Sequence, residues 1–173
     1  MKTVLCCDLQ QPYRETQFVT SMANKRQTNG DWAEKLVAKM CMCPKCKHPS
    51  GKLRKLIANF QCADLVCNFC GYVAQVKFKE QSNPNNIPNT IAGAAWGPQQ
   101  ARMQAGIYTP LFFVSADKSK RNYAIFYIPV DYQTKAMFVP RPPLQPPAQR
   151  AGWQGFKIDL KDLKAQGIIQ QLV

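Results

Sequence analysis

The stretch "CADLVCNFCGYVAQVKFKE", residues 62–80, places a cysteine pair directly before a segment in which polar and apolar residues alternate. The alternation runs over residues 72–79 and is typical of a β-strand with two unlike faces. Because side chains on a strand point to opposite faces in turn, Gln75 and Lys77 share one face. The stretch therefore predicts a cysteine-bearing turn that leads into a strand with a polar face.

The cysteines have the spacing of a metal site. Cys43-x-x-Cys46 and Cys67-x-x-Cys70 are two pairs with about twenty residues between them, which is the pattern of a four-cysteine zinc ribbon. Each pair forms a tight knuckle, and four thiolates complete a tetrahedron without an open position. We expect a structural Zn²⁺ in a ribbon at residues 43–70.

Neighbouring residues are weaker candidates as ligands. Cys41 and Cys62 flank the pairs, but neither completes a second pair, so we interpret both as ordinary small residues. His48 is the only histidine of the chain and is expected to be solvated or to face a phosphate. A single histidine gives poor support to Ser-His or Cys-His nucleophilic catalysis.

The amino-acid composition indicates what kind of partner the protein has. The 173 residues include 23 Lys+Arg against 10 Asp+Glu, a net charge of +13, which favours a polyanion as partner over an inert basic surface. The chain shows no apolar run long enough for a membrane span and no long basic amphipathic helix. The N-terminal apolar stretch is too short for a secretory signal, so we expect a cytoplasmic protein, where cysteines are more often metal ligands than disulfides.

The rest of the sequence indicates one α/β domain. We expect an irregular segment over residues 1–30, and then a helix over 31–40 with Asp31 as its N-cap. A short helix is expected from Pro98, and two buried strands at 111–116 and 123–130. Five prolines in "PRPPLQPPAQR" favour an extended arm, and the tail has room for a last strand and a helical turn.

The polar groups around the quoted stretch suggest a second site. Phosphodiester hydrolysis uses a hard cation held by oxygen ligands, with a polar or cationic group that positions water. Asp64 followed by Gln75-Val76-Lys77 has the order of the PD-(D/E)xK nuclease core, a mixed central sheet flanked by helices. There Asp64, Gln75 and the Val76 carbonyl would bind Mg²⁺, and Lys77 would orient water. The alternative is that Asp64 caps a turn and that the strand face is merely solvated.

More of the chain resembles the catalytic domains of DpnI-like, methyl-directed restriction endonucleases. The similar motifs follow one another from Asp31 to Leu160: "DW", "CPKC", "ADLVCNFC", "QVK", "LFFVS", "FYIP" and "RAGWQGFKIDL". The last motif is the most specific, because it is no general zinc or nuclease pattern. The resemblance implies a PD-(D/E)xK fold with an inserted zinc ribbon over residues 31–173.

The resemblance also implies roles. Asp64 and Lys77 match the catalytic aspartate and lysine of the family, and Gln75 stands where a metal-binding glutamate is expected. Trp153 matches a tryptophan that lies against adenine methyl groups in DNA, with Arg150 as a neighbouring DNA contact; the alternative for Trp153 is a core aromatic. The chain departs from the family at Gln75, which carries no charge, and in lacking a C-terminal winged helix.

Three functions follow as hypotheses. The first is a Mg²⁺-dependent type II endonuclease that cleaves double-stranded DNA at sites containing N6-methyladenine, such as GATC, as a homodimer or as a monomer that acts strand by strand. The second is a module that binds methylated DNA without cutting it. The third is a zinc-ribbon protein that binds nucleic acid, which leaves "RAGWQGFKIDL" unexplained.

Overall fold

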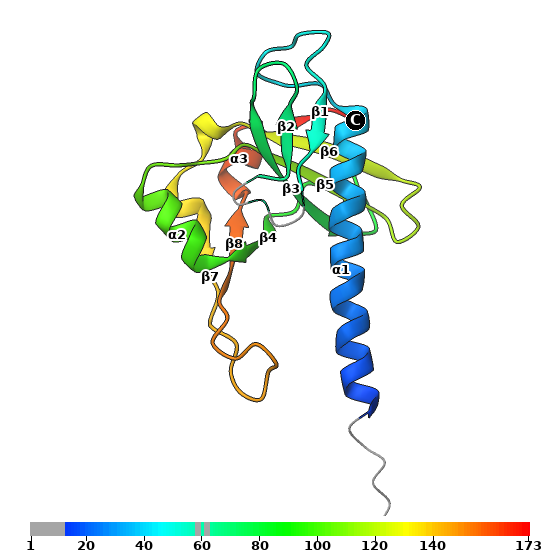
Figure 1. Cartoon of the computed structure of the whole chain (residues 1–173). Coiled ribbons are helices and arrows are strands. Elements are labelled where there is room, and N and C mark those ends of the chain that lie inside the picture. Colours follow the sequence, from blue (N-terminus) through cyan, green and yellow to red (C-terminus); the bar gives the residue numbers. More distant parts are fainter. Residues whose placement is uncertain (1–12, 58–59, 61–62) are drawn as a thin grey trace, which may run out of the picture.

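A six-stranded mixed sheet forms the centre of the computed structural model (Figure 1), which describes residues 13–57, 60 and 63–173. Its spatial order is β1-β2-β3-β5-β6-β9. The strands are β1 Leu53–Lys55, β2 Leu65–Cys67, β3 Val73–Glu80, β5 Leu111–Ala116, β6 Tyr123–Ile128 and β9 Gln170–Gln171. Only β3 and β5 pair in parallel, and the other neighbours are antiparallel. The expected mixed central sheet is confirmed.

One face of this sheet is covered by a smaller sheet and short helices. The three strands are β4 Thr90–Ala95, β8 Gly155–Asp159 and β7 Phe138–Pro140, in the order β4-β8-β7. The helices are α2 Trp96–Gln104 and α3 Lys161–Ala165, and single 3₁₀ turns lie at Val130–Tyr132 and Lys135–Met137. The first hydrophobic core joins Phe113 and Phe126 of the central sheet to Phe156 and Ile158 of the smaller sheet.

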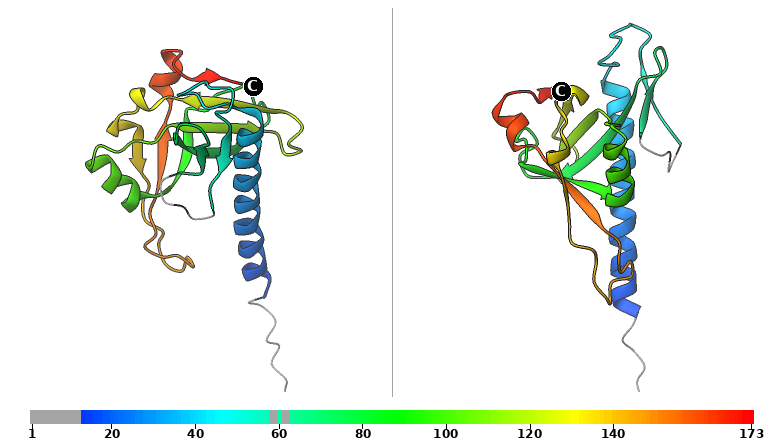
Figure 2. Two further views of the ribbon diagram at one scale, coloured as in Figure 1. Left: turned by 45° about the horizontal axis from the view of Figure 1, so that its top comes forward. Right: turned by 90° about the vertical axis from the view of Figure 1, so that its left-hand side faces the viewer.

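The other face carries α1 Tyr13–Met40, the long helix of Figures 1 and 2. Its residues Ala33 and Val37 are fully buried in a second core with Phe112, Val114 and Ile125. Since β5 has six buried residues in a row, each face of the strand contributes to one of the two cores. This continuous apolar run is what a strand covered on both faces requires.

The prediction of an irregular segment over residues 1–30 is wrong from residue 13 onward. The helix begins at Tyr13, so Asp31 lies inside it and is not its N-cap. Residues 13–30 are mostly polar and end in the turn-like pair Asn29-Gly30, yet this half of α1 is helical and projects beyond the sheet (Figure 1). An ion pair of 3.4 Å between Lys25 Nζ and Glu80 Oε2 ties it to the end of β3.

The expected strands at 72–79, 111–116 and 123–130 are confirmed within two residues, as is a short helix around Pro98. The proline-rich segment after β7 forms an exposed loop, as expected, but hydrogen bonds anchor it as a hairpin-like arm (Figure 2). Leu144 N donates to Trp153 O and Gly152 N to Leu144 O. The tail contains the expected strand and helical turn as β8 and α3. No helix of the described residues is long and apolar enough to cross a membrane.

Candidate functional site: a four-cysteine centre beside a polar cavity

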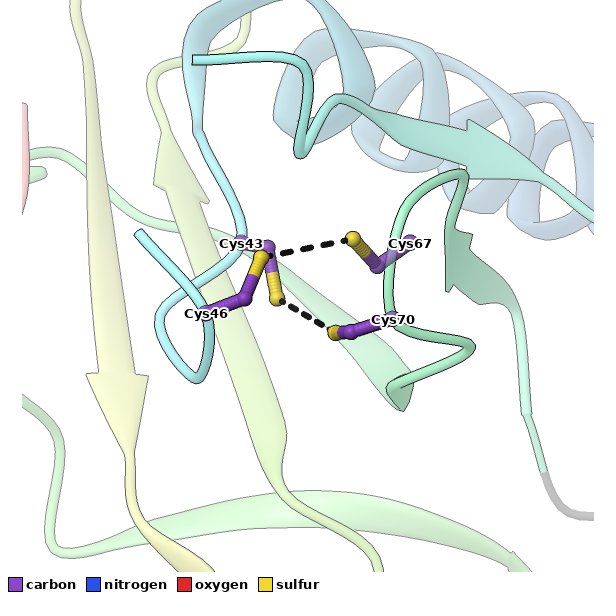
Figure 3. Close-up of side chains that lie close together, drawn as sticks. All are labelled: Cys43, Cys46, Cys67 and Cys70. Atoms are coloured by element: carbon purple, nitrogen blue, oxygen red, sulfur yellow. Dashed lines mark hydrogen bonds between the residues drawn. The ribbon is translucent and has the colours of Figure 1, made fainter. Parts of the chain in front are cut away.

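Four cysteine sulfur atoms meet at the turn that joins β2 to β3 (Figure 3). The Sγ atoms of Cys43, Cys46, Cys67 and Cys70 all lie within 4.8 Å of one another. The Cys43–Cys70 and Cys46–Cys67 pairs are 3.7 Å and 3.8 Å apart. A tetrahedral zinc with Zn–S bonds of about 2.3 Å needs sulfur–sulfur edges of about 3.8 Å. The donor set therefore fits Zn²⁺, and the predicted clustering of these four cysteines is confirmed.

The backbone shapes both knuckles for this purpose. Lys47 N donates to Cys43 O and Gly71 N to Cys67 O, which closes one turn over each pair. Gly51 packs against the first knuckle, where a Cβ atom would lie 2.8 Å from Cys46 Sγ. Burial raises the pKa of the Cys67 thiol, but N–H groups of Cys70 and Phe69 outweigh it and lower the value to about 7. This environment favours a thiolate, the form that binds metal.

Of the flanking candidates, Cys41 and His48 are described, and neither is in the sulfur cluster. Cys41 is buried in the second core, and this burial raises its thiol pKa to about 11, as fits an inert small residue. His48 stacks on Phe69 with ring centroids 3.8 Å apart, and its Nδ1 accepts a hydrogen bond from Ser50 N. Cys62 lies outside the described residues.

Asp64 directly precedes β2 and is held against β3. Its backbone N–H donates to Ala74 O at 2.9 Å, and its Oδ2 accepts a hydrogen bond of 2.7 Å from Val76 N. Gln75 N bonds in the opposite direction, to Pro110 O beside β5. Since successive residues of a strand direct their peptide groups to opposite edges, the Val76 carbonyl faces the same edge as Asp64. The Asp64 side chain therefore bonds across to the neighbouring strand, and its role as a metal ligand stays a prediction.

A cavity of about 240 Å³ brings the predicted side chains together. Asp64, Gln75 and Lys77 line it from the β2–β3 side, and Gln99 and Arg102 from α2. Further lining residues are Phe60, Ala63, Ala94, Ala95, Pro98 and Phe156. The polar strand face thus faces a cavity between the two sheets, and the alternative of a merely solvated face does not describe it.

The cavity perturbs Lys77. Burial of its ammonium group lowers the pKa of Lys77 below the ordinary lysine value, the nearby Asp64 carboxylate opposes this change, and the Arg102 guanidinium adds to it. A lysine with a lowered pKa exchanges a proton more readily near neutral pH than an exposed lysine does. Lysines in this condition recur in active sites.

Acidic residues of α1 form a second polar group beside Asp64, which the sequence analysis did not identify. Asp31, Glu34, Lys55 and Asp64 line an adjacent cavity of about 350 Å³. Lys55 Nζ pairs with Glu34 Oε2 at 2.9 Å and also contacts Asp31. Hydrogen bonds from Lys35 and Lys55 lower the pKa of Asp31 to about 2. The run "DWAEK" could have indicated part of this group, because Asp31 and Lys35 are four residues apart and form an ion pair on the helix.

Arg150 and Trp153 lie on the arm, and the root of the arm adjoins the cavity. The Arg150 guanidinium carbon is 4.9 Å from the centre of the Trp153 ring. The ring packs on Gly155, where a Cβ atom would meet Trp153 Cη2 at 2.8 Å. Gly155 pairs with Ala95, which lines the cavity. Trp153 is half-buried by the arm and belongs to neither described core, so the core alternative is wrong.

These features define a mixed α/β protein with a four-cysteine cluster that could hold zinc and a cavity lined by a carboxylate, two amides and two cations. The chain matches the model of the family DpnI: Dam-replacing family over residues 12–173, and it therefore belongs to this family. The family is one of methyl-directed restriction endonucleases, so membership implies a nuclease with a DNA substrate.

Proposed function

We propose that this protein is a Mg²⁺-dependent type II endonuclease with a PD-(D/E)xK core that cleaves duplex DNA at sites containing N6-methyladenine, with GATC as the first sequence to test. The observation that carries the proposal is the single cavity that contains Asp64, Gln75 and Lys77. Family membership supports a restriction endonuclease, and the net charge of +13 suits a duplex substrate.

The oxygen donors fit a hard cation. The Asp64 carboxylate, the Gln75 amide oxygen and the Val76 carbonyl would hold Mg²⁺, since this ion prefers oxygen ligands and is commonly bound through one or two carboxylates. When bound, Mg²⁺ supplies Lewis-acid stabilisation of the scissile phosphate and acidifies a water. Within the chain, Val76 N orients the carboxylate through Asp64 Oδ2. Lys77 would hold the attacking water and exchange its proton.

Methyl recognition is assigned to the arm. Trp153 presents a rigid aromatic surface, and such a surface gains from apolar contact with a methyl group in a DNA groove. Arg150 covers this ring and would contact the backbone beside it. Because Gly155 joins the arm to the cavity wall at Ala95, recognition and cleavage would occur on neighbouring nucleotides.

The test uses plasmid DNA that contains GATC sites, prepared from adenine-methylating and non-methylating hosts, with Mg²⁺ present. We expect cleavage of the methylated DNA only, and loss of cleavage with Asp64→Ala and with Lys77→Ala while methylated DNA is still bound. Lys79→Ala is the matched control, since Lys79 follows on the same strand but does not line the cavity. Undiminished cleavage by Asp64→Ala would refute this assignment.

A second function is favoured by one residue. Gln75 gives the cavity no second carboxylate, so Asp64 is the only acidic side chain among its lining residues. A domain that binds methylated DNA without cutting it would fit this composition. It predicts a methyl-dependent mobility shift of GATC duplexes and intact plasmid at every Mg²⁺ or Mn²⁺ concentration.

A further inference from the structure

Two residues of α2, Gln99 and Arg102, form the wall of the cavity that faces Lys77. Neither has a role in the function proposed above. They are three residues apart on the helix, so their side chains lie on one side of it. Their polar groups enter the cavity from the element opposite the strand that carries Gln75 and Lys77.

Gln99 is a largely buried residue whose amide opens onto the cavity. It is only 8% exposed, and its side chain makes no hydrogen bond to any of the residues that the structure describes. The described side-chain atoms that are buried from solvent without a partner belong to Ser115 and Gln133, so the Gln99 amide keeps contact with solvent in the cavity. A polar ligand that enters the cavity can replace this solvent and take up the hydrogen bonds of the amide.

Arg102 is a cation without a carboxylate partner among the described residues. It lines the same cavity as Lys77. Among the described residues Asp64 is the only carboxylate that lines the cavity, so two cations face one anion. This excess of positive charge attracts an anion, and the planar fork of a guanidinium matches two oxygens of a phosphate.

We propose that Arg102 and Gln99 bind the non-bridging oxygens of a DNA backbone phosphate inside this cavity. Arg102 would donate two parallel hydrogen bonds to the phosphate, and the Gln99 amide would donate another. This inference rests on the proposed function in taking duplex DNA as the ligand, but it does not require that the DNA be cut. The volume of about 240 Å³ accommodates a phosphate group with its waters and is too small for a base pair.

The first experiment measures binding of a fluorescent methylated GATC duplex as a function of KCl concentration, with Ca²⁺ in place of Mg²⁺. Arg102→Ala should weaken binding about tenfold and reduce the slope of log K against log salt by about 0.9, the value for one lost phosphate contact. Arg102→Lys should restore the slope and only part of the affinity, because a point charge replaces the fork. Arg121→Ala, in the exposed β5–β6 turn, is the control and should change neither quantity by as much.

The second experiment separates a binding role from a structural one. Gln99→Met keeps the length of the side chain and removes the amide. We expect this variant to keep the Tm of the free protein within a few degrees of the wild-type value and to weaken DNA binding about threefold. A purely structural role of Gln99 predicts a lower Tm and unchanged DNA binding by the protein that remains folded.

The outcomes distinguish this inference from the proposed function. DNA binding without cleavage, together with the smaller salt slope of Arg102→Ala, would refute the endonuclease and support the phosphate contact. An unchanged slope and affinity in Arg102→Ala would overturn the phosphate contact, whether or not the wild type cleaves. A further outcome is that inorganic phosphate raises the Tm of the wild type but not of Arg102→Ala, while DNA binding is the same for both proteins. That result would overturn DNA as the source of the phosphate.

Discussion

Gly155 links the arm to the cavity wall, and replacing it with alanine tests whether the position of Trp153 controls methyl recognition. A Cβ atom at residue 155 would lie 2.8 Å from Trp153 Cη2 and 3.0 Å from Trp153 Cζ3. Ordinary carbon–carbon contacts are about 3.5–4.0 Å, so the ring must move by roughly 0.7 Å or more. The backbone of Gly155 is not in the left-handed region, so the effect of Gly155→Ala is steric.

The size of the Gly155→Ala effect on stability depends on how freely the Trp153 ring can move. Overpacking in a core costs about 1–3 kcal/mol, and the lower value applies here because Trp153 is half-buried on an exposed arm. We therefore expect a loss of stability of about 1 kcal/mol. A displaced ring no longer meets the methyl groups, so the preference for methylated over unmethylated GATC duplex should fall about tenfold, or ~1.4 kcal/mol of binding free energy.

The assay is a pair of dissociation constants, for methylated and unmethylated duplexes of one sequence, with a urea unfolding curve for each variant. Gly97→Ala is the matched control, because a Cβ atom there meets nothing within 4 Å. It lies within α2 and should be as stable as the wild type or slightly more stable, with methyl discrimination unchanged. If Gly155→Ala keeps full discrimination, Trp153 is not the methyl-reading residue.

Two further outcomes are expected. Gln75→Glu adds a second carboxylate to the cavity and should raise the affinity for Ca²⁺, a non-cleaving stand-in for Mg²⁺, about tenfold by isothermal titration; an unchanged affinity would remove Gln75 from the metal site. Lys35 and Lys55 lower the pKa of Asp31 from 3.8 to about 2, so the ionised carboxylate should stabilise the fold at pH values above its pKa in the unfolded chain. This contribution should be lost as the pH falls toward 2. Urea unfolding from pH 2 to pH 5 should show less pH dependence in Asp31→Asn, and equal curves would contradict the assignment.

The order of residue types along the sequence predicted the parts of the molecule whose structure depends on residues close together in the chain. The four cysteines have the spacing of a metal site, and β3 alternates with the period of a strand. The apolar runs of β5 and β6 have no period, and their short length and aromatic and β-branched residues indicated strands. The N-terminal half of α1 was missed because residues 13–30 are mostly polar and end in Asn29-Gly30, a pair typical of turns.

The wall of the cavity opposite Lys77 could not be predicted from the sequence. Gln99 and Arg102 are more than twenty positions from Lys77, and only the stacking of the two sheets brings them near it. "PQQARMQ" has the composition of an ordinary polar helix, so its residue types carry no sign of a site. The same holds for Glu34, which approaches Asp64 because α1 crosses the end of β1.

The register of β2 against β3 connects the cysteine centre to the cavity. Leu65 pairs with Ala74, which places Asp64 next to Gln75 and lets its carboxylate reach Val76 N. A slip of one residue would turn Asp64 to the opposite face. β2 has only three residues, too few to fix a register firmly, whereas Cys67 at its end is held in the sulfur cluster. Zinc should therefore determine where Asp64 lies, beyond stabilising its own lobe.

Removal of zinc should consequently abolish cleavage before it unfolds the protein. A zinc-selective chelator is titrated in excess Mg²⁺, and released zinc, DNA cleavage and far-UV circular dichroism are followed together. We expect cleavage to fall in proportion to the zinc released, while β5, β6 and the smaller sheet keep most of the dichroism, since Phe113, Phe126 and Ile158 pack in the first core, which contains no cysteine. Added zinc should restore cleavage. Full cleavage by zinc-free protein would show that the β2–β3 register holds without the metal, and the link between the two sites would then be wrong.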